Sequence, residues 1–502
     1  MAFVDGTVVN VALAALQSAL GATAIDVQWV VEAYALFLAA LLLVGGSLGD
    51  VYGRKKVYVA GVAMFAAASA WCGIAPDIGH LILARAVQGV GAALLVPGSL
   101  AIIRTSFDEQ SRGRAIGTWS AFTAITAAVG PVLGGWLIEH VSWRWVFFIN
   151  LPIAMIVVAI AIWRVPESSD RRQPMDWRGA GLVTTGLGGI VYALVESSDR
   201  GWGDLLVMGT LAVGIVSLSA FLLVEARSRT PLLPLSLFRS RDFSGANLLT
   251  LFLYSALSGA LFFFPLNLIQ IQGYSATAAG AASLPFIILM FLLSRWSGSL
   301  VDRFGPRPPL VIGPVIAATG FALFAVPSTG GSYWTTFFPA VTVLGLGMAV
   351  SVAPLTTTVM NAVGEAQAGV ASGINNAVSR VAALLAIALL GMIMLMTFTH
   401  HFRTSLNALA IPVAERNQLM EKSLRMAAID VPDGPSAGAI RAAIDASFVG
   451  GFRIVMMIAA GLALASALCA WLFIGRKGNG GETESVSPPA ATIAHNGGKN
   501  AG

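Results

Sequence analysis

Charged residues are scarce in this chain of 502 residues. They make up 11%, against about 25% in a typical soluble domain, while hydrophobic residues make up 56%. An ordinary soluble core with a charged surface cannot be built from this composition. Cysteine is also rare, and both Cys72 and Cys469 lie inside apolar runs, where a thiol behaves as a small hydrophobe. The sequence therefore predicts neither a disulfide nor a metal site.

Nucleotide-binding and hydrolase motifs are missing or out of place. No G-x-x-x-x-G-K-[ST] stretch occurs, which argues against ATP-driven transport. Residues 45–49 match the G-x-S-x-G pattern of serine hydrolases, but that motif needs a strand and a soluble sheet. Here it follows a membrane-length apolar run. We therefore expect no enzymatic activity and no cofactor.

Long apolar runs follow one another along nearly the whole chain. Each can cross about 30 Å of hydrocarbon as a helix whose backbone satisfies its own hydrogen bonds. The runs predict an all-α polytopic protein embedded in a lipid bilayer. We expect fourteen spans, at approximately 1–20, 28–48, 57–75, 80–103, 115–138, 145–163, 179–196, 204–224, 244–268, 277–297, 309–326, 334–357, 369–397 and 451–475.

Lys and Arg are concentrated in the loops after even-numbered spans and in the C-terminal tail, whereas the short loops after odd-numbered spans carry only Arg144 and Arg200. Basic residues are retained on the cytoplasmic side. Both termini are therefore expected in the cytoplasm, with 398–450 as a long extracytoplasmic loop and 476–502 as a disordered cytoplasmic tail. This topology explains the net charge of +5, so we expect no nucleic-acid partner.

A polar, glycine-rich turn occurs twice in the chain. Residues 46–53 (GSLGDVYG) and 298–305 (GSLVDRFG) agree at five of eight positions, one copy after the second span and one after the tenth. Repeats in corresponding places of two halves are typical of transporter folds. We expect an N-terminal six-helix bundle, an inserted helix pair and a C-terminal six-helix bundle, with boundaries at 1–164, 179–225 and 243–475.

Four motifs together resemble the fourteen-helix drug:proton antiporter branch of the major facilitator superfamily. They are GGSLGDVYGRKK at 45–56, LILARAVQGVGAA at 81–93, Gly117 with AVGPVLGG at 128–135, and FVDGTVVNVAL at 3–13. The resemblance implies a multidrug efflux transporter of an inner (plasma) membrane, which exports small amphipathic compounds in exchange for protons by alternating access. It also implies a monomer, with or without a periplasmic adaptor. An uptake permease and a non-transporting membrane sensor are the alternatives.

Apart from residues at the ends of the spans, four charged residues lie inside apolar spans, namely Asp5, Glu32, Arg85 and Arg380. Each costs about 2.5–3.5 kcal/mol at the membrane centre and is normally paired or water-facing. Glu32 and Arg85 lie at matching depth, about 7 Å from the outer ends of their spans, and could form a pair. The four residues are our candidates for proton coupling and transport. Alternatively, Glu32 is solvated near the interface and Arg85 is a structural tie.

The repeated turn predicts a gate between the two halves. Its glycines allow a tight turn, and Asp50 can pair with a base, for which Arg112 and Arg114 on the next cytoplasmic loop are best placed. An ordinary turn retained by its positive charge is the alternative. The predicted gating residues are Gly46, Asp50, Gly53, Arg54, Arg112, Arg114 and, in the second copy, Asp302.

The fifth-span motif carries no side chains that could do chemistry, so its role must be geometric. Pro131 bends the helix, and the glycines let a neighbouring helix approach closely. The resemblance links this motif to export. Its residues are Gly117, Gly130, Pro131, Gly134 and Gly135.

Gln88, Asn375 and Asn376 are the polar, uncharged candidates for the substrate cavity. The resemblance implies that both asparagines face the cavity together with Arg380. An interhelical hydrogen-bond cluster is the alternative reading of the asparagines.

Overall fold

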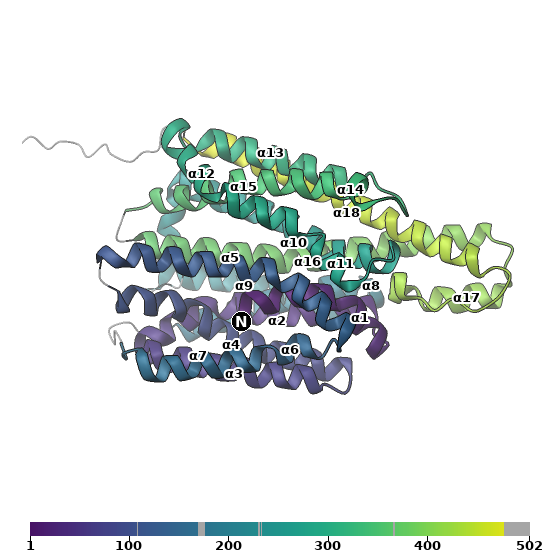
Figure 1. Cartoon of the computed structure of the whole chain (residues 1–502), viewed down its shortest axis with the longest axis horizontal. Helices are drawn as coiled ribbons and strands as arrows, with labels where there is room; N and C mark the ends of the chain where they lie inside the picture. The colour runs from purple at the N-terminus through teal and green to yellow at the C-terminus, as the bar shows by residue number, and fades with distance from the viewer. Residues whose placement is uncertain (108, 169–175, 229–230, 232, 365–366, 476–502) are drawn as a thin grey trace, which may run out of the picture.

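The computed structural model describes residues 1–107, 109–168, 176–228, 231, 233–364 and 367–475, and all regular elements in these ranges are helical (Figure 1). In chain order they are α1 (Ala2–Leu20), α2 (Ala24–Tyr52), α3 (Arg54–Ile74), α4 (Ile78–Ser106), α5 (Glu109–His140), α6 (Trp145–Phe148), α7 (Asn150–Arg164), α8 (Trp177–Arg200), α9 (Leu205–Arg227), η1 (Leu235–Arg239), α10 (Arg241–Leu266), η2 (Asn267–Ile271), α11 (Ala276–Ala281), α12 (Leu284–Phe304), α13 (Arg307–Phe324), α14 (Tyr333–Thr336), α15 (Phe338–Asn361), α16 (Ala368–Ala408), α17 (Val413–Glu421), η4 (Ser423–Ala428) and α18 (Ala437–Phe473). The tail 476–502 lies outside the described residues.

Within these ranges, twelve helices are long and apolar enough to cross a membrane. The all-helical polytopic fold predicted from the sequence is confirmed. Helix α1 contributes a shorter apolar stretch, Val4–Leu20, and α5 is not among the twelve. The count of fourteen spans therefore stays a prediction.

The helices form two groups that lie side by side along their length (Figure 1). In the first group α2 and α3 both pack against α4, and α1 packs against α5. In the second group α13 packs against α15, and α18 packs against both α10 and α13. Helices α2 and α16 contact each other across the boundary between the groups.

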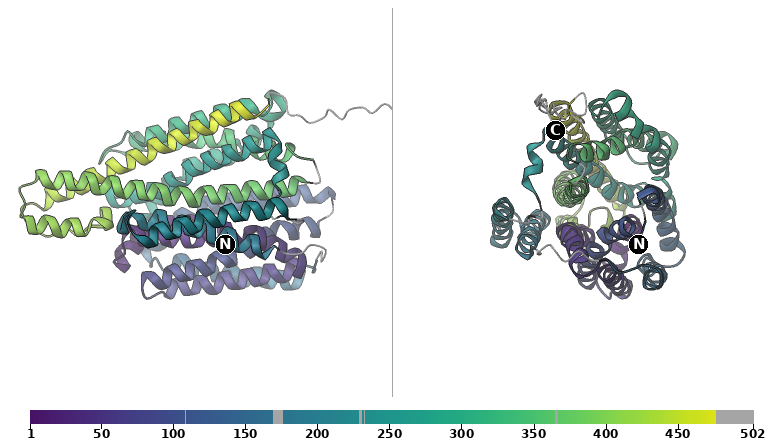
Figure 2. Two further views of the ribbon diagram at one scale, coloured as in Figure 1. Left: turned by 180° about the vertical axis from the view of Figure 1, so that it is seen from behind. Right: turned by 90° about the vertical axis from the view of Figure 1, so that its left-hand side faces the viewer.

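The inserted pair α8–α9 lies outside both groups. Its two helices pack tightly together, since Gly189 of α8 and Gly214 of α9 lie against the partner's backbone. Helix α8 also packs against α2 of the first group and α16 of the second. Seen along the bundle, the pair stands to one side of the two groups (Figure 2, right).

The segment 398–450, which the sequence predicts as a long extracytoplasmic loop, is largely helical. Helix α16 continues to Ala408 and α18 already begins at Ala437, and the two project beyond the other helices with α17 (Figure 1). Polar residues lower the average hydropathy here and hide a helical apolar stripe. Fully buried residues recur every four positions on both helices: Phe398, Phe402 and Leu406 on α16, and Ile440, Ile444 and Phe448 on α18.

The turn between α1 and α2 is fixed by local chemistry. Gly21 ends α1 with φ 61°, in the left-handed region that favours glycine. Thr23 then caps α2 in a capping box, because its hydroxyl accepts from the Asp26 amide and the Asp26 carboxylate accepts from the Thr23 amide. We call this end of the bundle the Gln17 end. The opposite end, where α2 gives way to α3, is the Asp50 end.

Candidate functional site

Asp5 and Arg85 form a buried ion pair between α1 and α4. Arg85 Nη1 lies 2.6 Å from Asp5 Oδ2, and both side chains are only 1% exposed. The Arg85 Nε also donates to the backbone carbonyl of Val30 at 3.0 Å, and the guanidinium lies 4.2 Å from the ring centre of Tyr34. The predicted pairing of Arg85 with Glu32 is wrong. The equal depth of Glu32 and Arg85 gives only their positions along the helix axes. Their pairing depends on the direction in which each side chain points, and Arg85 points toward Asp5.

Two amides complete the coordination of the Asp5 carboxylate. Gln88 Nε2 and Asn150 Nδ2 donate to Asp5 Oδ1 at 2.9 and 3.2 Å, and both amides also donate to the Ser69 hydroxyl. Gln88 in addition accepts from Arg85 at 2.7 Å. A guanidinium and two amides thus donate to one carboxylate, which satisfies both of its oxygens inside the protein. We call Asp5, Ser69, Arg85, Gln88 and Asn150 the Asp5 cluster.

Gln88, a candidate for the substrate cavity, is therefore part of the Asp5 cluster. Asn150 and Ser69 were not predicted from the sequence. Asn150 is a buried amide at the start of α7, and an uncharged polar residue in an apolar run was the only signal that could have found it. The alternative that Arg85 is a structural tie fits its contacts.

Glu32 lies in the first half of α2 and is fully buried. Neither carboxylate oxygen has a hydrogen-bond partner within the described part of the chain. The alternative that Glu32 is solvated near the interface is wrong. A carboxyl group buried without a partner is costly to ionise.

At the Asp50 end, Asp50 pairs with Arg54, one helical turn along the chain. Arg54 Nη2 lies 2.7 Å from Asp50 Oδ1, and the Asp50 side chain is 46% exposed. The predicted partners Arg112 and Arg114 lie in α5, but their side chains, like the surroundings of Gly117, are outside the described part of the structure. In this conformation Asp50 is paired with Arg54. The ion pair of Asp50 with Arg112 or Arg114 stays a prediction.

Gly53 forms the tight turn between α2 and α3. Its φ of 110° is unfavourable for other residues, and a β-carbon there would come within 2.7 Å of the Glu167 carboxylate. Glu167 accepts from the Lys55 amide, and the Ser168 carbonyl accepts from the Arg54 amide. The segment after α7 thus satisfies the first amides of α3.

A cavity of about 380 Å³ lies next to Asp50, between α2 and α4 of one half and α16 of the other. Gly46, Asp50, Arg54, Asn376 and Arg380 line it, together with apolar residues such as Leu42 and Leu43. The Asn376 amide donates to the backbone of its own helix at Ser372. The cavity thus combines charged groups with apolar walls, as a site for an amphipathic compound would.

Asn375 ties α16 to α10 instead of facing this cavity. Its amide donates to Thr250 Oγ1 at 2.7 Å and to Asn247 Oδ1 at 3.2 Å. For Asn375, this arrangement corresponds to the alternative reading, an interhelical hydrogen-bond cluster. The repeated acid Asp302 is exposed at the same end of the bundle and lines a separate cavity of about 1160 Å³ with Arg241 and Arg307.

The glycines of the α5 motif lie at two interfaces. Gly130 and Gly134 lie against Thr7 and Val8 of α1, where an added β-carbon would overlap those side chains. Gly135 lies against the Ala276 backbone of α11, and Gly280 of α11 lies against the Pro131 carbonyl in return. Small residues on both sides therefore let the two halves approach closely at this point.

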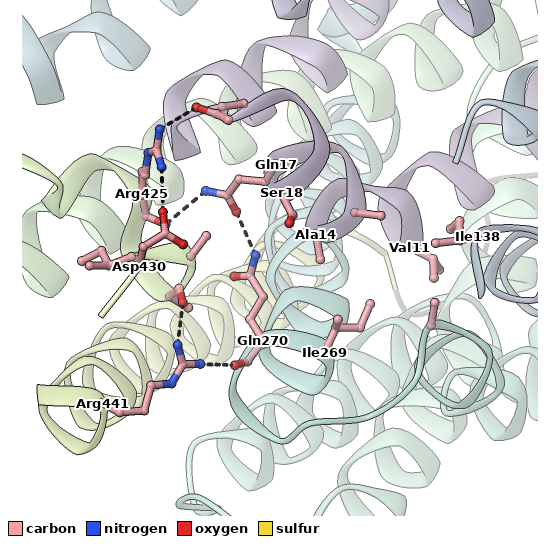
Figure 3. A pocket seen from close by; sticks show the side chains of 17 residues that line it. Val11, Ala14, Gln17, Ser18, Ile138, Ile269, Gln270, Arg425, Asp430 and Arg441 are labelled. Carbon is pink, nitrogen blue, oxygen red and sulfur yellow. Dashed lines mark hydrogen bonds and ion pairs between the residues drawn. The ribbon is translucent and has the colours of Figure 1, made fainter. Parts of the chain in front are cut away.

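Hydrogen bonds between the halves gather at the Gln17 end (Figure 3). Gln270 donates to Gln17 at 2.8 Å, and Gln17 donates to the Arg425 carbonyl at 3.1 Å. Arg441 donates to the Gln270 carbonyl at 2.8 Å. These groups border a pocket of about 430 Å³. Near it, Thr277 Oγ1 donates to the Glu139 carboxylate at 2.6 Å.

Among the residues that the structure describes, no group of three His, Cys, Asp or Glu side chains could hold a metal ion. The chemistry available at the site is therefore that of carboxylates, amides and arginines. Such groups can bind protons and polar parts of a ligand.

Known proteins are similar in sequence to most of this chain. The tetracenomycin C resistance and export protein of Streptomyces glaucescens is 31% identical over 478 residues, which cover 94% of this chain and 88% of that protein. The puromycin resistance protein of Streptomyces alboniger is 38% identical over 391 residues, which cover 77% and 78%. Transporter relatives of this kind indicate that the chain is not an enzyme.

Solved structures match over the whole length as well. A bacterial homologue of the human lysosomal transporter Spinster, in an inward-facing and unoccupied conformation, shares a TM-score of 0.65 and covers 95% of both chains. The sequence identity is 16%, so this likeness shows the fold alone. The family model described as Major Facilitator Superfamily matches residues 1–387. The chain belongs to the Major Facilitator Superfamily.

Proposed function

We propose that the protein is a proton-driven exporter of small amphipathic compounds in a bacterial-type inner membrane. The observation that carries this proposal is the likeness, over nearly the whole chain, to proteins named for antibiotic resistance and export. The glycine motif of α5, which packs against both α1 and the opposite half, resembles the antiporter motif, and this resemblance favours export.

Proton coupling is supported by two buried carboxyl groups in opposite surroundings. Asp5 is paired with Arg85, whereas Glu32 has no hydrogen-bond partner among the described residues. A group that carries a proton through a transport cycle must lose it in one conformation and regain it in another. We propose Glu32 for that role, with Asp5 and Arg85 holding α1 and α4 together.

Alternating access is supported by the unequal ends of the bundle. At the Gln17 end, hydrogen bonds between the halves border the pocket of about 430 Å³, whereas beside Asp50 charged and apolar residues of both halves line the cavity of about 380 Å³. The basic residues near the Asp50 end favour a cytoplasmic location for it. In this conformation the substrate cavity, with Arg380 and Asn376 in its wall, would face the cytoplasm.

The domain organisation follows the same proposal. Residues 1–164 and 243–475 form the two moving bundles of six spans each, and 179–225 form the inserted pair, which gives fourteen spans. Both termini are cytoplasmic. The protein works as a monomer, and a periplasmic adaptor is compatible with the projecting ends of α16 and α18.

Everted membrane vesicles test the proposal directly. An exporter accumulates substrate in such vesicles when a pH gradient is imposed without ATP, and a protonophore abolishes the accumulation. A resistance and efflux screen with dyes, quaternary ammonium compounds and antibiotics would supply the substrate. Accumulation only in right-side-out vesicles would indicate an uptake permease, and binding without proton movement would indicate a sensor.

A further inference from the structure

The inserted helix α8 makes specific contacts with α2. The indole nitrogen of Trp29 donates to Glu196 at 2.9 Å, and the ring centres of Trp29 and Tyr192 lie 6.0 Å apart. About two helical turns further along α2, a β-carbon at Gly188 would lie 3.5 Å from the Leu36 side chain. The two helices are therefore antiparallel, and one face of α2, which includes Trp29 and Leu36, is directed at α8.

An adjacent face of α2 is directed at α16 of the other half. Gln28 Nε2 donates to the Ile387 carbonyl at 3.1 Å, and Gly391 lies against the same amide. Further along, Leu43 lies beside Gly373. This pair of helices is also antiparallel, and it forms part of the boundary across which the two halves meet.

The helical register places Glu32 between these two faces. Glu32 lies one helical turn after Gln28, which faces α16, and one turn before Leu36, which faces α8. On the surface of α2 it therefore lies between these two residues. Val30 and Tyr34, which contact Arg85, lie on the opposite side of the helix. Glu32 therefore points into the junction of α2, α8 and α16 and away from the Asp5 cluster.

Buried apolar residues line this junction at the level of Glu32. Val191 on α8 and Leu384 on α16 are both 0% exposed, and both belong to the same hydrophobic cluster as the neighbours of Glu32 on α2. The titratable groups that α8 directs toward α2 are Tyr192 and Glu196, of which Glu196 accepts from Trp29. On α16, Arg380 lies one turn beyond Leu384 and lines the cavity beside Asp50. Among the other elements packed against α2, α1 and α4 carry Asp5 and Arg85, which bind each other. Arg425 on η4 lies at the Gln17 end, where it donates to the Gly21 carbonyl.

We infer that α8 is the third wall of a protonation site: α2, α8 and α16 together enclose the carboxyl group of Glu32, and water reaches it only when α2 and α16 separate. This inference rests on the proposed proton-driven export and assigns a role to the inserted pair. Helix α8 keeps lipid and water away from Glu32 while the halves are joined at the Gln17 end. The carboxyl group exchanges its proton with water only when that boundary opens.

Modification by dicyclohexylcarbodiimide, which attacks protonated carboxyl groups in apolar surroundings, tests the inference. The full-length protein in lipid nanodiscs is treated over a range of pH, and the fraction modified at Glu32 is measured by mass spectrometry. We compare Val191→Thr, which places a hydroxyl on the buried side of α8 at the level of Glu32, with Val216→Thr, the same change on the exposed face of α9. We expect the midpoint to fall by about one pH unit in Val191→Thr, the effect of one hydrogen bond to the ionised form, and to stay unchanged in Val216→Thr.

A second arm leaves the site itself untouched. Cysteines at Gln17 and Gln270, joined by a cleavable bifunctional thiol reagent, hold the Gln17 end closed. We expect the cross-linked protein to keep Glu32 modifiable at a pH where the free protein has lost the reaction, and cleavage to reverse this difference. Equal midpoints for Val191→Thr and Val216→Thr, no effect of the cross-link, or no modification of Glu32 at any pH would each overturn the inference.

Transport driven by a pH gradient is measured on the same preparations, so that the two proposals fail separately. If the gradient drives no transport but Glu32 titrates as described, proton-coupled export is wrong and the protonation site stands. If the gradient drives transport but α8 and the cross-link have no influence on Glu32, only the present inference is wrong.

Discussion

Two carboxyl groups in this transporter are equally buried and chemically opposite. Asp5 lies within one half of the molecule, where Arg85, Gln88 and Asn150 all donate to it. Glu32 lies at the boundary between the halves and has no hydrogen-bond partner among the described residues. Burial alone therefore does not identify a proton carrier. The partners decide the charge state, and the location decides whether that state can change during transport.

The largest effect is expected from removing the partner of Asp5. Arg85→Met leaves an unpaired carboxylate in a dry site, and breaking a buried pair from one side costs about 3–5 kcal/mol of stability. We expect a variant that inserts poorly or unfolds at much lower denaturant concentration. The double variant Asp5→Asn with Arg85→Met should recover most of the loss. Equal stabilities of the single and double variants would show that the pair contributes little.

The second prediction tests the α5 motif, which packs against the helix that carries Asp5. Gly134→Leu places a bulky side chain against Val8 and should block the close approach of α5 and α1. We expect normal insertion and no efflux. Gly209→Leu is the matched control, because nothing lies within 4 Å of a β-carbon at Gly209 on α9. Full efflux by Gly134→Leu would show that close packing at this motif is not needed for transport.

A smaller effect on stability should separate the two acids. Glu32→Gln keeps the size of the side chain and removes no hydrogen bond among the described residues, so we expect the free energy of unfolding to change by less than about 1 kcal/mol. Asp5→Asn leaves Arg85 without its counter-charge and should cost several times more. Thermal unfolding of the purified variants measures both. Equal losses would contradict the assigned roles of the two acids.

The smallest effect is expected at the Asp50 end. Asp50 is half-exposed, and exposed ion pairs contribute about 0.2–1 kcal/mol, so Asp50→Asn should slow transport by no more than about fivefold. The reduction should be the same for every substrate, with unchanged binding affinity and unchanged pH dependence of binding. A changed pH dependence would move the coupling role from Glu32 to Asp50.

The fold followed from the sequence because membrane-length apolar runs and the repeated turn are local signals. The ends of α16 and α18 were missed, since averaging over polar residues hides a stripe of buried side chains such as Phe402 and Ile444. A sequence gives the depth of a residue in the membrane but not the direction of its side chain. For this reason Arg85 was assigned to Glu32 although it binds Asp5.

The candidate site was predicted as a set of residues rather than as an arrangement. Asp5, Arg85 and Gln88 do meet, but Asn150 and Ser69 complete their cluster and carried no distinguishing signal. Uncharged polar side chains are common in apolar runs, and only tertiary packing selects the few that bind a carboxylate. The position of α8 beside Glu32 likewise depends on contacts between residues far apart in the sequence.

The most direct test of the account compares proton-independent exchange with net efflux in Glu32→Gln. Purified protein is reconstituted into liposomes, and substrate exchange at equilibrium and uphill transport driven by a pH gradient are measured over a range of pH. We predict that Glu32→Gln keeps exchange, loses uphill transport and loses the pH dependence of both. Uphill transport with an unchanged pH profile in Glu32→Gln would show that Glu32 does not carry the proton.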